Sequence, residues 1–222
     1  MLTVAAHDTA GQFVWLWHIY LALTVAVGLL VTAAIVLVAV RYRRRPGRPP
    51  RRDPDSAPRV EAVYLLVIAA VVVGLLGATY RTENREDALT AHPAVRVQVT
   101  ASQWQWQFSY PALHITDVAH NIGSRHPRFA RLVVPAGRPV EFRLRSADVL
   151  HSFFVPAMRF KRYAFPDSDN RFVLTFPHPG RYLGECAQFC GWDHAEMRFT
   201  VVVLTPARFS AWLAAHGHGS PA

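Results

Sequence analysis

The 222-residue sequence has only two cysteines, Cys186 and Cys190, four positions apart. Two cysteines cannot build the framework of several disulfides that holds a small secreted domain together. The sequence also lacks a Cys-x-x-Cys-His motif, which excludes a c-type haem attached to this chain. A single cysteine pair outside the cytoplasm is usually a disulfide, so its role depends on the residues around it.

Charge is missing from two long stretches. From Phe13 to Val40 there is no Asp, Glu, Lys or Arg, and from Val60 to about Tyr80 the single charged residue is Glu61. Both stretches are long enough to cross a bilayer. Residues 1–12 show no basic segment and no obvious cleavage site, so we expect a permanent span rather than a cleaved signal peptide.

The basic residues are unevenly distributed. Eight of the 24 Lys and Arg residues lie between Arg41 and Arg59, with two acids among them. A basic loop between two spans marks the cytoplasmic side, so the N-terminus and the chain after the second span should lie outside. We therefore predict a transmembrane hairpin over residues 1–91, with spans at 13–40 and 60–80, a cytoplasmic loop at 41–59 and a connector at 81–91. No nucleic-acid partner is expected.

Residues 92–222 have the texture of a β domain. Many short strands divided by Pro and Gly turns are typical of a sandwich or barrel. Thr205-Pro206 predicts the start of a short helix that continues through Ala215. The predicted strands are Val95–Thr100, Gln103–Tyr110, Phe129–Val134, Val140–Arg145, Ser152–Val155, Phe172–Phe176, Tyr182–Glu185 and Arg198–Leu204.

One predicted strand is unusually aromatic. In Gln103–Tyr110, period-two alternation would place Trp104, Trp106 and Phe108 on one face. Such a face is normally part of the core. Two tryptophans also suit a surface for electron transfer or for partner docking.

The segment Gly184–Met197 concentrates metal-binding side chains. It reads Cys-x3-Cys-x3-His-x2-Met, and thiolate, imidazole and thioether ligands together suit copper. A mononuclear blue-copper site needs one thiolate, so two cysteines favour two coppers bridged by two thiolates. His151, upstream, offers the second imidazole. A disulfide remains an alternative, as does a thioredoxin-like copper chaperone, although the βαβ alternation of that fold is not found.

With these motifs the sequence closely resembles subunit II of haem-copper cytochrome c oxidases, over nearly its whole length. The Asp-Val-x-His-Ser and Cys-x3-Cys-x3-His-x2-Met motifs are specific to that family. The resemblance implies a membrane-anchored all-β protein, with a two-helix hairpin followed by a cupredoxin-like Greek-key β-sandwich that holds a binuclear CuA centre. The implied ligands are His151, Cys186, Cys190, His194, Met197 and the backbone carbonyl of Gln188.

The resemblance also implies a function and partners. Electrons from a c-type cytochrome would enter through Trp104 and pass through CuA to haem in subunit I, where oxygen reduction is coupled to proton pumping. Glu61 would stand at the entrance of a proton pathway. The other partners would be the remaining oxidase subunits and the lipid of the cell's inner membrane, with the CuA domain periplasmic. The alternatives are the CuA subunit of a nitric oxide reductase and a membrane-tethered copper chaperone. A quinol oxidase subunit is disfavoured, since those relatives have lost the copper ligands.

Three positions differ from the family pattern. Gln188 stands where Glu usually also binds magnesium at the subunit I interface, so we expect weak or absent magnesium. Phe154 replaces a Trp. The segment Arg159–Tyr163 is basic where the family offers an acid to a basic cytochrome c. From Arg81 onward there are 16 Lys and Arg against 11 Asp and Glu, which predicts a neutral or acidic donor.

Overall fold

The computed structural model describes residues 9–43, 57–118 and 128–216. They separate into two compact units. One comprises Val14–Thr82, and the other comprises the chain from Glu83 onward together with the first described residues through Phe13.

Two long helices, α1 (Thr9–Arg41) and α2 (Pro58–Asp87), make up the N-terminal part of the chain. Their apolar segments, of 31 and 28 residues, have mean hydropathies of 2.8 and 2.5. At about 1.5 Å per residue, both exceed the roughly 30 Å of a bilayer's hydrocarbon core. Tyr20 of α1 and Thr79 of α2 hydrogen-bond through their hydroxyls, 2.9 Å apart. Length and composition therefore agree with the two expected spans.

The ends of these helices bear on two expectations. α2 continues to Asp87, into the stretch expected to be a connector, because nothing before that residue breaks the helix. Glu61 lies in the exposed first turn of α2, where the helix dipole favours a carboxylate. Most of the basic loop, residues 44–56, lies outside the described residues.

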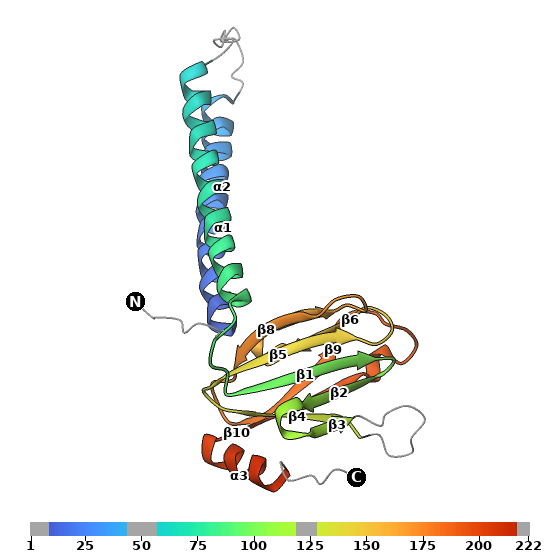
Figure 1. Cartoon of the computed structure of the whole chain (residues 1–222). Coiled ribbons are helices and arrows are strands. Elements are labelled where there is room, and N and C mark those ends of the chain that lie inside the picture. Colours follow the sequence, from blue (N-terminus) through green and yellow to red (C-terminus); the bar gives the residue numbers. More distant parts are fainter. Residues whose placement is uncertain (1–8, 44–56, 119–127, 217–222) are drawn as a thin grey trace. The chain divides into compact units, whose positions relative to one another are not determined.

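The second unit is a sandwich of two five-stranded sheets (Figure 1). The first sheet has the order β3 (Ile115–Val118), β2 (Gln105–Tyr110), β1 (Val95–Ser102), β5 (Pro139–Ser146) and β8 (Asn170–Thr175). The second has the order β4 (Ala130–Pro135), β10 (Arg198–Leu204), β9 (Gly180–Cys186), β6 (His151–Val155) and β7 (Phe160–Ala164).

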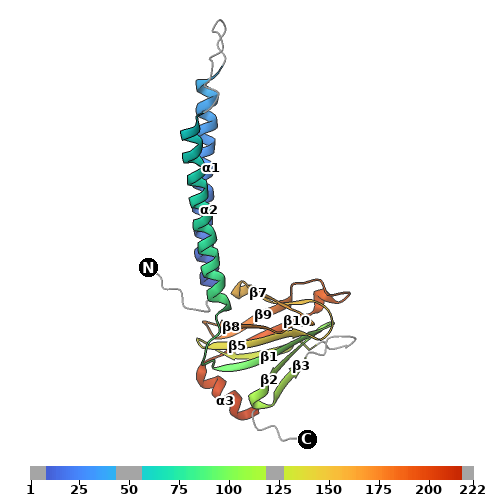
Figure 2. The same ribbon diagram turned by 45° about the horizontal axis from the view of Figure 1, so that its top comes forward.

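The remaining elements close the sandwich and cap its edge. Three short 3₁₀ turns lie at Pro111–Leu113, Pro156–Met158 and His194–Glu196. The helix α3 (Pro206–His216) packs beside β4 and β10, at one edge of the two layers (Figure 2). The predicted hairpin, β-sandwich and C-terminal helix are confirmed.

Aromatic side chains fill the space between the sheets. Phe142 and Phe172 of the first sheet stack at 5.1 Å between ring centroids, and Phe153 and Phe199 of the second stack at 4.8 Å. The edge of Trp106 meets both Phe153 and Phe199. All five are fully buried, so the inner faces of the strands form one continuous apolar core.

The aromatic strand was predicted two residues too long. β2 begins at Gln105, and Trp104 lies in the turn that joins it to β1. Trp106, Phe108 and Tyr110 point into the core, so their shared face is structural. Trp104 is half-buried and separate from that face.

The sequence analysis also missed two edge strands, β3 and β7. β3 has four residues and includes a charge, Asp117. β7 contains Lys161 and Arg162, which conceal its alternation and are typical of a protected sheet edge. The basic segment expected to meet a donor is therefore largely an edge strand of the second sheet.

Glu141 on β5 is a buried carboxylate that accepts hydrogen bonds from Arg96 and Arg171. Burial raises the pKa of its carboxyl, but the two arginines outweigh burial and hold that pKa below its ordinary value of about 4.5. The pairing thus stabilises the fold fully above pH 4.5 and loses its contribution as the pH falls through the lowered folded-state pKa.

Replacing Glu141 with Gln should lower the free energy of unfolding by about 1 kcal/mol at pH 7, since both guanidiniums are more than half exposed and screened. Thermal unfolding of the full chain should show this deficit at pH 7 and a smaller one at pH 3. The half-exposed Glu185→Gln serves as the control. A deficit that is equal at both pH values would contradict the ion-pair account.

Candidate metal centre

The candidate ligands come from two neighbouring strands and the loop that follows them. His151 is the first residue of β6, and Cys186 is the last residue of β9. These strands are paired, with Phe153 opposite Cys186, so His151 lies beside the cysteine. The loop then returns to β10, and Cys186 N donates to Met197 O at 3.0 Å across its base. Ala187 N donates to Ser152 O at 3.1 Å and fixes the start of the loop to β6.

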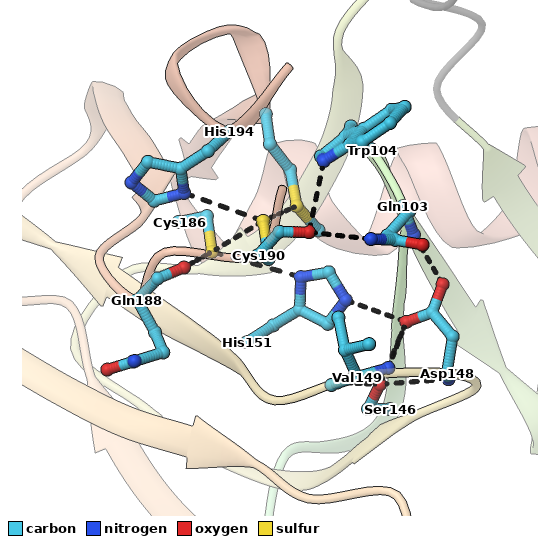
Figure 3. Close-up of polar contacts among 11 residues, drawn as sticks. Gln103, Trp104, Ser146, Asp148, Val149, His151, Cys186, Gln188, Cys190 and His194 are labelled. Carbon is cyan, nitrogen blue, oxygen red and sulfur yellow. Dashed lines mark hydrogen bonds and ion pairs between the residues drawn. The ribbon is translucent and has the colours of Figure 1, made fainter. Parts of the chain in front are cut away.

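The side chains of this group converge on one point (Figure 3). The two sulfurs of Cys186 and Cys190 are 3.9 Å apart. His151 Nδ1 lies 3.9 Å from Cys186 Sγ, and His194 Nδ1 lies 3.5 Å from Cys190 Sγ. Met197 Sδ is 3.8 Å from Cys190 Sγ, and the Gln188 carbonyl oxygen is 3.2 Å from Cys186 Sγ. All six predicted ligand groups are therefore brought together.

This geometry fits a metal better than a disulfide. A disulfide requires sulfurs about 2.05 Å apart, and both thiols are free. An ion that bonds each sulfur at about 2.3 Å can bridge up to about 4.6 Å, so the 3.9 Å separation is within reach. The ligand atoms of His151, Cys186 and Cys190 lie within 4.8 Å of one another, and all three residues are buried. They form a possible metal site.

Asp148 holds the imidazole of His151 in position. The ring nitrogen Nε2 lies 2.8 Å from Asp148 Oδ1 and, since a carboxylate only accepts, Nε2 donates. In the neutral ring that a metal requires, Nδ1 would present its lone pair toward the sulfurs. Burial raises the pKa of the Asp148 carboxyl, but hydrogen bonds from Gln103 N, His151 and Val149 N hold it below its ordinary value. Asp148 thus stays ionised.

The two thiols differ in their electrostatic surroundings. Burial raises the pKa of Cys186, but hydrogen bonding with His151 and with the backbone near Gln188 and Ser152 brings that pKa below its ordinary value. Burial and the charge of Cys186 raise the pKa of Cys190 to about 12. Two thiolates this close repel each other, so a bound cation would favour losing both protons.

Trp104 and Gln103 hydrogen-bond to the backbone of the cysteine loop. Trp104 Nε1 donates to the Cys190 carbonyl at 3.2 Å, and Gln103 Nε2 donates to the same oxygen at 2.7 Å (Figure 3). Gln103 N also donates to Asp148 Oδ2 at 2.7 Å. The turn before β2 is thus joined to both the cysteine loop and the histidine segment.

Gly191 allows Trp104 to lie against the backbone of the cysteine loop. Its φ of +122° lies in a region that favours glycine, and a Cβ there would lie 2.9 Å from both Trp104 Cζ2 and Gln103 Nε2. Gly191 follows Cys190 directly. The glycine therefore lets the indole lie against a ligand's backbone.

Sequence reasoning missed some members of this site. Gln103 was treated only as part of a strand, and no pattern marks it as a bridge between Cys190 and Asp148. Phe189 and Trp192 lie within the loop and are 76% and 92% exposed. Two large aromatic residues flanking a metal-binding cysteine could have been recognised from the sequence as candidate site residues, because such residues are seldom exposed to solvent without a binding partner.

Gln188 contributes its backbone carbonyl, and not its side chain, to this group. The Gln188 carbonyl faces Cys186, while its side chain points away from the sulfurs (Figure 3). Glu61 belongs to α2, in the other of the two compact units.

Residues 95–204 match the family model for the periplasmic domain of cytochrome c oxidase subunit II. The probable cytochrome c oxidase subunit 2 of Streptomyces avermitilis is 30% identical over 243 residues, which cover 93% of this chain and 75% of that protein. The chain belongs to the cytochrome c oxidase subunit II family.

A solved structure of the same family supports the fold. The periplasmic domain of cytochrome oxidase subunit II from Bradyrhizobium japonicum superposes with a TM-score of 0.51 at 26% identity, covering 58% of this chain and 96% of that one. A quinol oxidase subunit 2 from Bacillus cereus is also similar, at 28% identity over 83% of this chain and 62% of that protein. Similarity alone therefore leaves the electron donor open.

Family membership gives the chain its broad role. It is a subunit of a cytochrome c oxidase, and copper and electron transport follow from the family. The two apolar helices and the periplasmic-domain match fit a membrane-anchored subunit II.

Proposed function

We propose that this chain accepts electrons from a c-type cytochrome at a binuclear CuA centre and passes them to haem in subunit I, for oxygen reduction coupled to proton pumping. The observation that carries the proposal is the pair of free thiols 3.9 Å apart, with two imidazoles and two weak donors around them. Two sulfurs with one imidazole and one weak donor available for each of two ions match a thiolate-bridged pair. This retained donor set also argues against a quinol oxidase role.

When bound, a thiolate-bridged copper pair supplies one-electron redox chemistry with the charge shared between two ions. The residues of this chain hold the ligands in place and provide the path to them. Asp148 fixes the His151 ring, and paired strands fix the backbones of His151 and Cys186. A rigid ligand set favours electron transfer because little has to move when the charge changes.

Trp104 connects the surface of the domain to this ligand set. Its half-buried indole donates one hydrogen bond to the Cys190 carbonyl. An electron that arrives at the indole can therefore pass to the ligand set through this hydrogen bond rather than through solvent. The role of Trp104 as the residue through which electrons enter rests on this contact and on the family resemblance.

Replacing Trp104 with Phe removes the N–H donor and should slow reduction of the copper centre by a c-type cytochrome at least about 10-fold, which corresponds to an increase of roughly 1.4 kcal/mol in the barrier. Stopped-flow absorbance of the purified oxidase measures this rate, and copper analysis shows that the site is still filled. Trp212→Phe, at a half-buried tryptophan packed on Tyr110, is the matched control. Equal rates in both variants would remove Trp104 from the path.

Glu61 is proposed to stand at the proton-uptake side. The motivation is its exposed position in the first turn of α2 and the basic loop that precedes it in the sequence. Glu61→Ala should slow oxygen turnover while leaving reduction of copper by the donor unchanged. Normal turnover in that variant would mean that Glu61 only anchors the helix end at the headgroups.

The order of reduction tests the function itself. After mixing the oxidase with reduced cytochrome, the copper absorbance should change before the haem absorbance. Haem reduction that precedes copper reduction would contradict the proposal.

Metal analysis of the same sample should find magnesium below one per complex because of Gln188, and stoichiometric magnesium would show that expectation to be wrong. A nitric oxide reductase partner would reveal itself by the gas consumed, and a copper chaperone by a single Cu(I).

A further inference from the structure

Four arginines occupy adjoining positions on the outer face of the first sheet. Arg96 lies on β1, Arg143 and Arg145 on β5, and Arg171 on β8. Arg143 stands opposite Arg171 on one side and Gln98 on the other, and Arg145 stands opposite Thr100. Alternation places all four on the side away from the core, and all four are exposed. We call this surface the arginine face.

The carboxylates of this surface lie beneath the arginines. Glu141, whose side chain is 7% exposed, pairs with Arg96 and Arg171, whose side chains are 65% and 52% exposed. Asp169 pairs with Arg143 and is likewise the more covered partner. A partner would therefore meet guanidinium groups first. Two acids against four arginines leave an excess of positive charge.

Arg145 supplies part of that excess. Within the described part of the chain it forms no ion pair within 4.0 Å. The hydrogen bond from Arg143 is the main cause that lowers the pKa of the Asp169 carboxyl, and the charge of Arg145 adds to it. Among the described residues, its guanidinium is thus the one of the four without an ion pair, so its charge is the least neutralised on this face. A planar fork of N–H donors binds a carboxylate well.

The surface is also hollowed. A depression of about 490 Å³ is lined by residues that include Arg96, Arg143 and Arg171, and a neighbouring one of about 160 Å³ is lined by residues that include Arg143 and Arg145. Gln98 lines both and joins them. Acidic side chains of a partner could insert between the arginines.

The arginine face is continuous with the Trp104 turn. β1 and β5 are parallel and end at the metal centre, where Ala101 stands opposite Ser146. Ala147 N donates to Ala101 O at 2.8 Å, and Asp148 accepts from Gln103 N. Arg145 is thus two positions before a segment bonded to the turn that carries Trp104. A protein on this face comes close to the residue proposed to receive its electron.

We propose that the arginine face is the docking surface for an acidic electron-donor protein, such as a c-type cytochrome domain with carboxylates around its haem edge. This proposal rests on the proposed function, and it names the donor's charge. Charge complementarity steers encounters and raises association rates.

The test uses the whole oxidase complex in detergent, with stopped-flow reduction by an acidic c-type cytochrome over a range of salt concentrations. The rate should fall as salt rises. Arg145→Gln should slow reduction about threefold at low salt and flatten the salt dependence. Asp169→Asn removes a negative charge and should speed reduction. Arg181→Gln, on β9 of the other sheet, removes the same charge elsewhere and should leave the rate unchanged.

Several results would overturn the proposal. Equal effects of Arg145→Gln and Arg181→Gln would show that only net charge matters. Faster reduction by a basic cytochrome c than by an acidic one would show that the donor's charge has the opposite sign. Unchanged reduction with weaker binding of Arg145→Gln to phosphatidylglycerol vesicles would assign the face to lipid. Copper content and the copper spectrum of the same samples separate the two proposals. A missing centre defeats the proposed function, whereas a normal centre with insensitive kinetics defeats only the docking surface.

Discussion

Replacing Cys186 with serine is expected to abolish the paired-copper signal of the full-length protein. The Cys186 sulfur lies between Cys190 Sγ, His151 Nδ1 and the Gln188 carbonyl, so it touches more of the ligand set than any single imidazole does. A serine hydroxyl stays protonated at neutral pH and is a poor bridging ligand for copper. Copper should then fall to one per chain or fewer, and any remaining ion should give the spectrum of an isolated copper. Metal analysis and electron spin resonance measure both.

Met197→Leu is the matched comparison for this prediction. Met197 is fully buried, and leucine nearly conserves its volume, so the fold should tolerate the change. Since a thioether is a weak ligand, its loss should shift the reduction potential while both coppers stay bound. If Cys186→Ser kept a paired spectrum, or if Met197→Leu lost copper as completely as the cysteine variant, the assignment of ligand roles would be wrong.

Gly184→Ala should be among the most damaging single substitutions in the β domain. Gly184 of β9 lies opposite Phe199 of β10, and a Cβ at Gly184 would fall 2.0 Å from the Phe199 ring. That ring is fully buried and packed against Phe153 and Trp106, so it has little room to move. We expect a loss of about 3 kcal/mol in unfolding free energy. Copper binding should weaken too, because Cys186 is two residues away.

A double variant tests the cause. Phe199→Leu creates space at the same contact, so Gly184→Ala combined with Phe199→Leu should be less destabilised than the sum of the two single variants. Chemical denaturation followed by tryptophan fluorescence gives the three free energies. Simple additivity would mean that the glycine is needed for some reason other than the Phe199 ring.

The ligand set was predictable because its spacing carries the chemistry. Cys186, Cys190, His194 and Met197 lie within twelve positions, and a short loop between paired strands brings such residues together whatever its details. The two spans were predictable because a bilayer requires long uncharged stretches, and Phe13–Val40 provides one.

Other features depend on contacts between distant segments. The half-buried position of Trp104 follows from where β1 ends and from the space left by Gly191, and period-two alternation could not show either. β7 was not predicted because edge strands carry charged residues that mask the alternation of apolar and polar positions. The arginine face needed the register of β1, β5 and β8, since Arg96 and Arg171 are neighbours only through Glu141.

The spin signal of the copper-loaded, full-length protein tests the central claim most directly. Two coppers per chain that share one unpaired electron equally, with hyperfine structure from both nuclei, are the predicted result. One copper per chain with the hyperfine pattern of a single nucleus would contradict a binuclear centre built on Cys186 and Cys190.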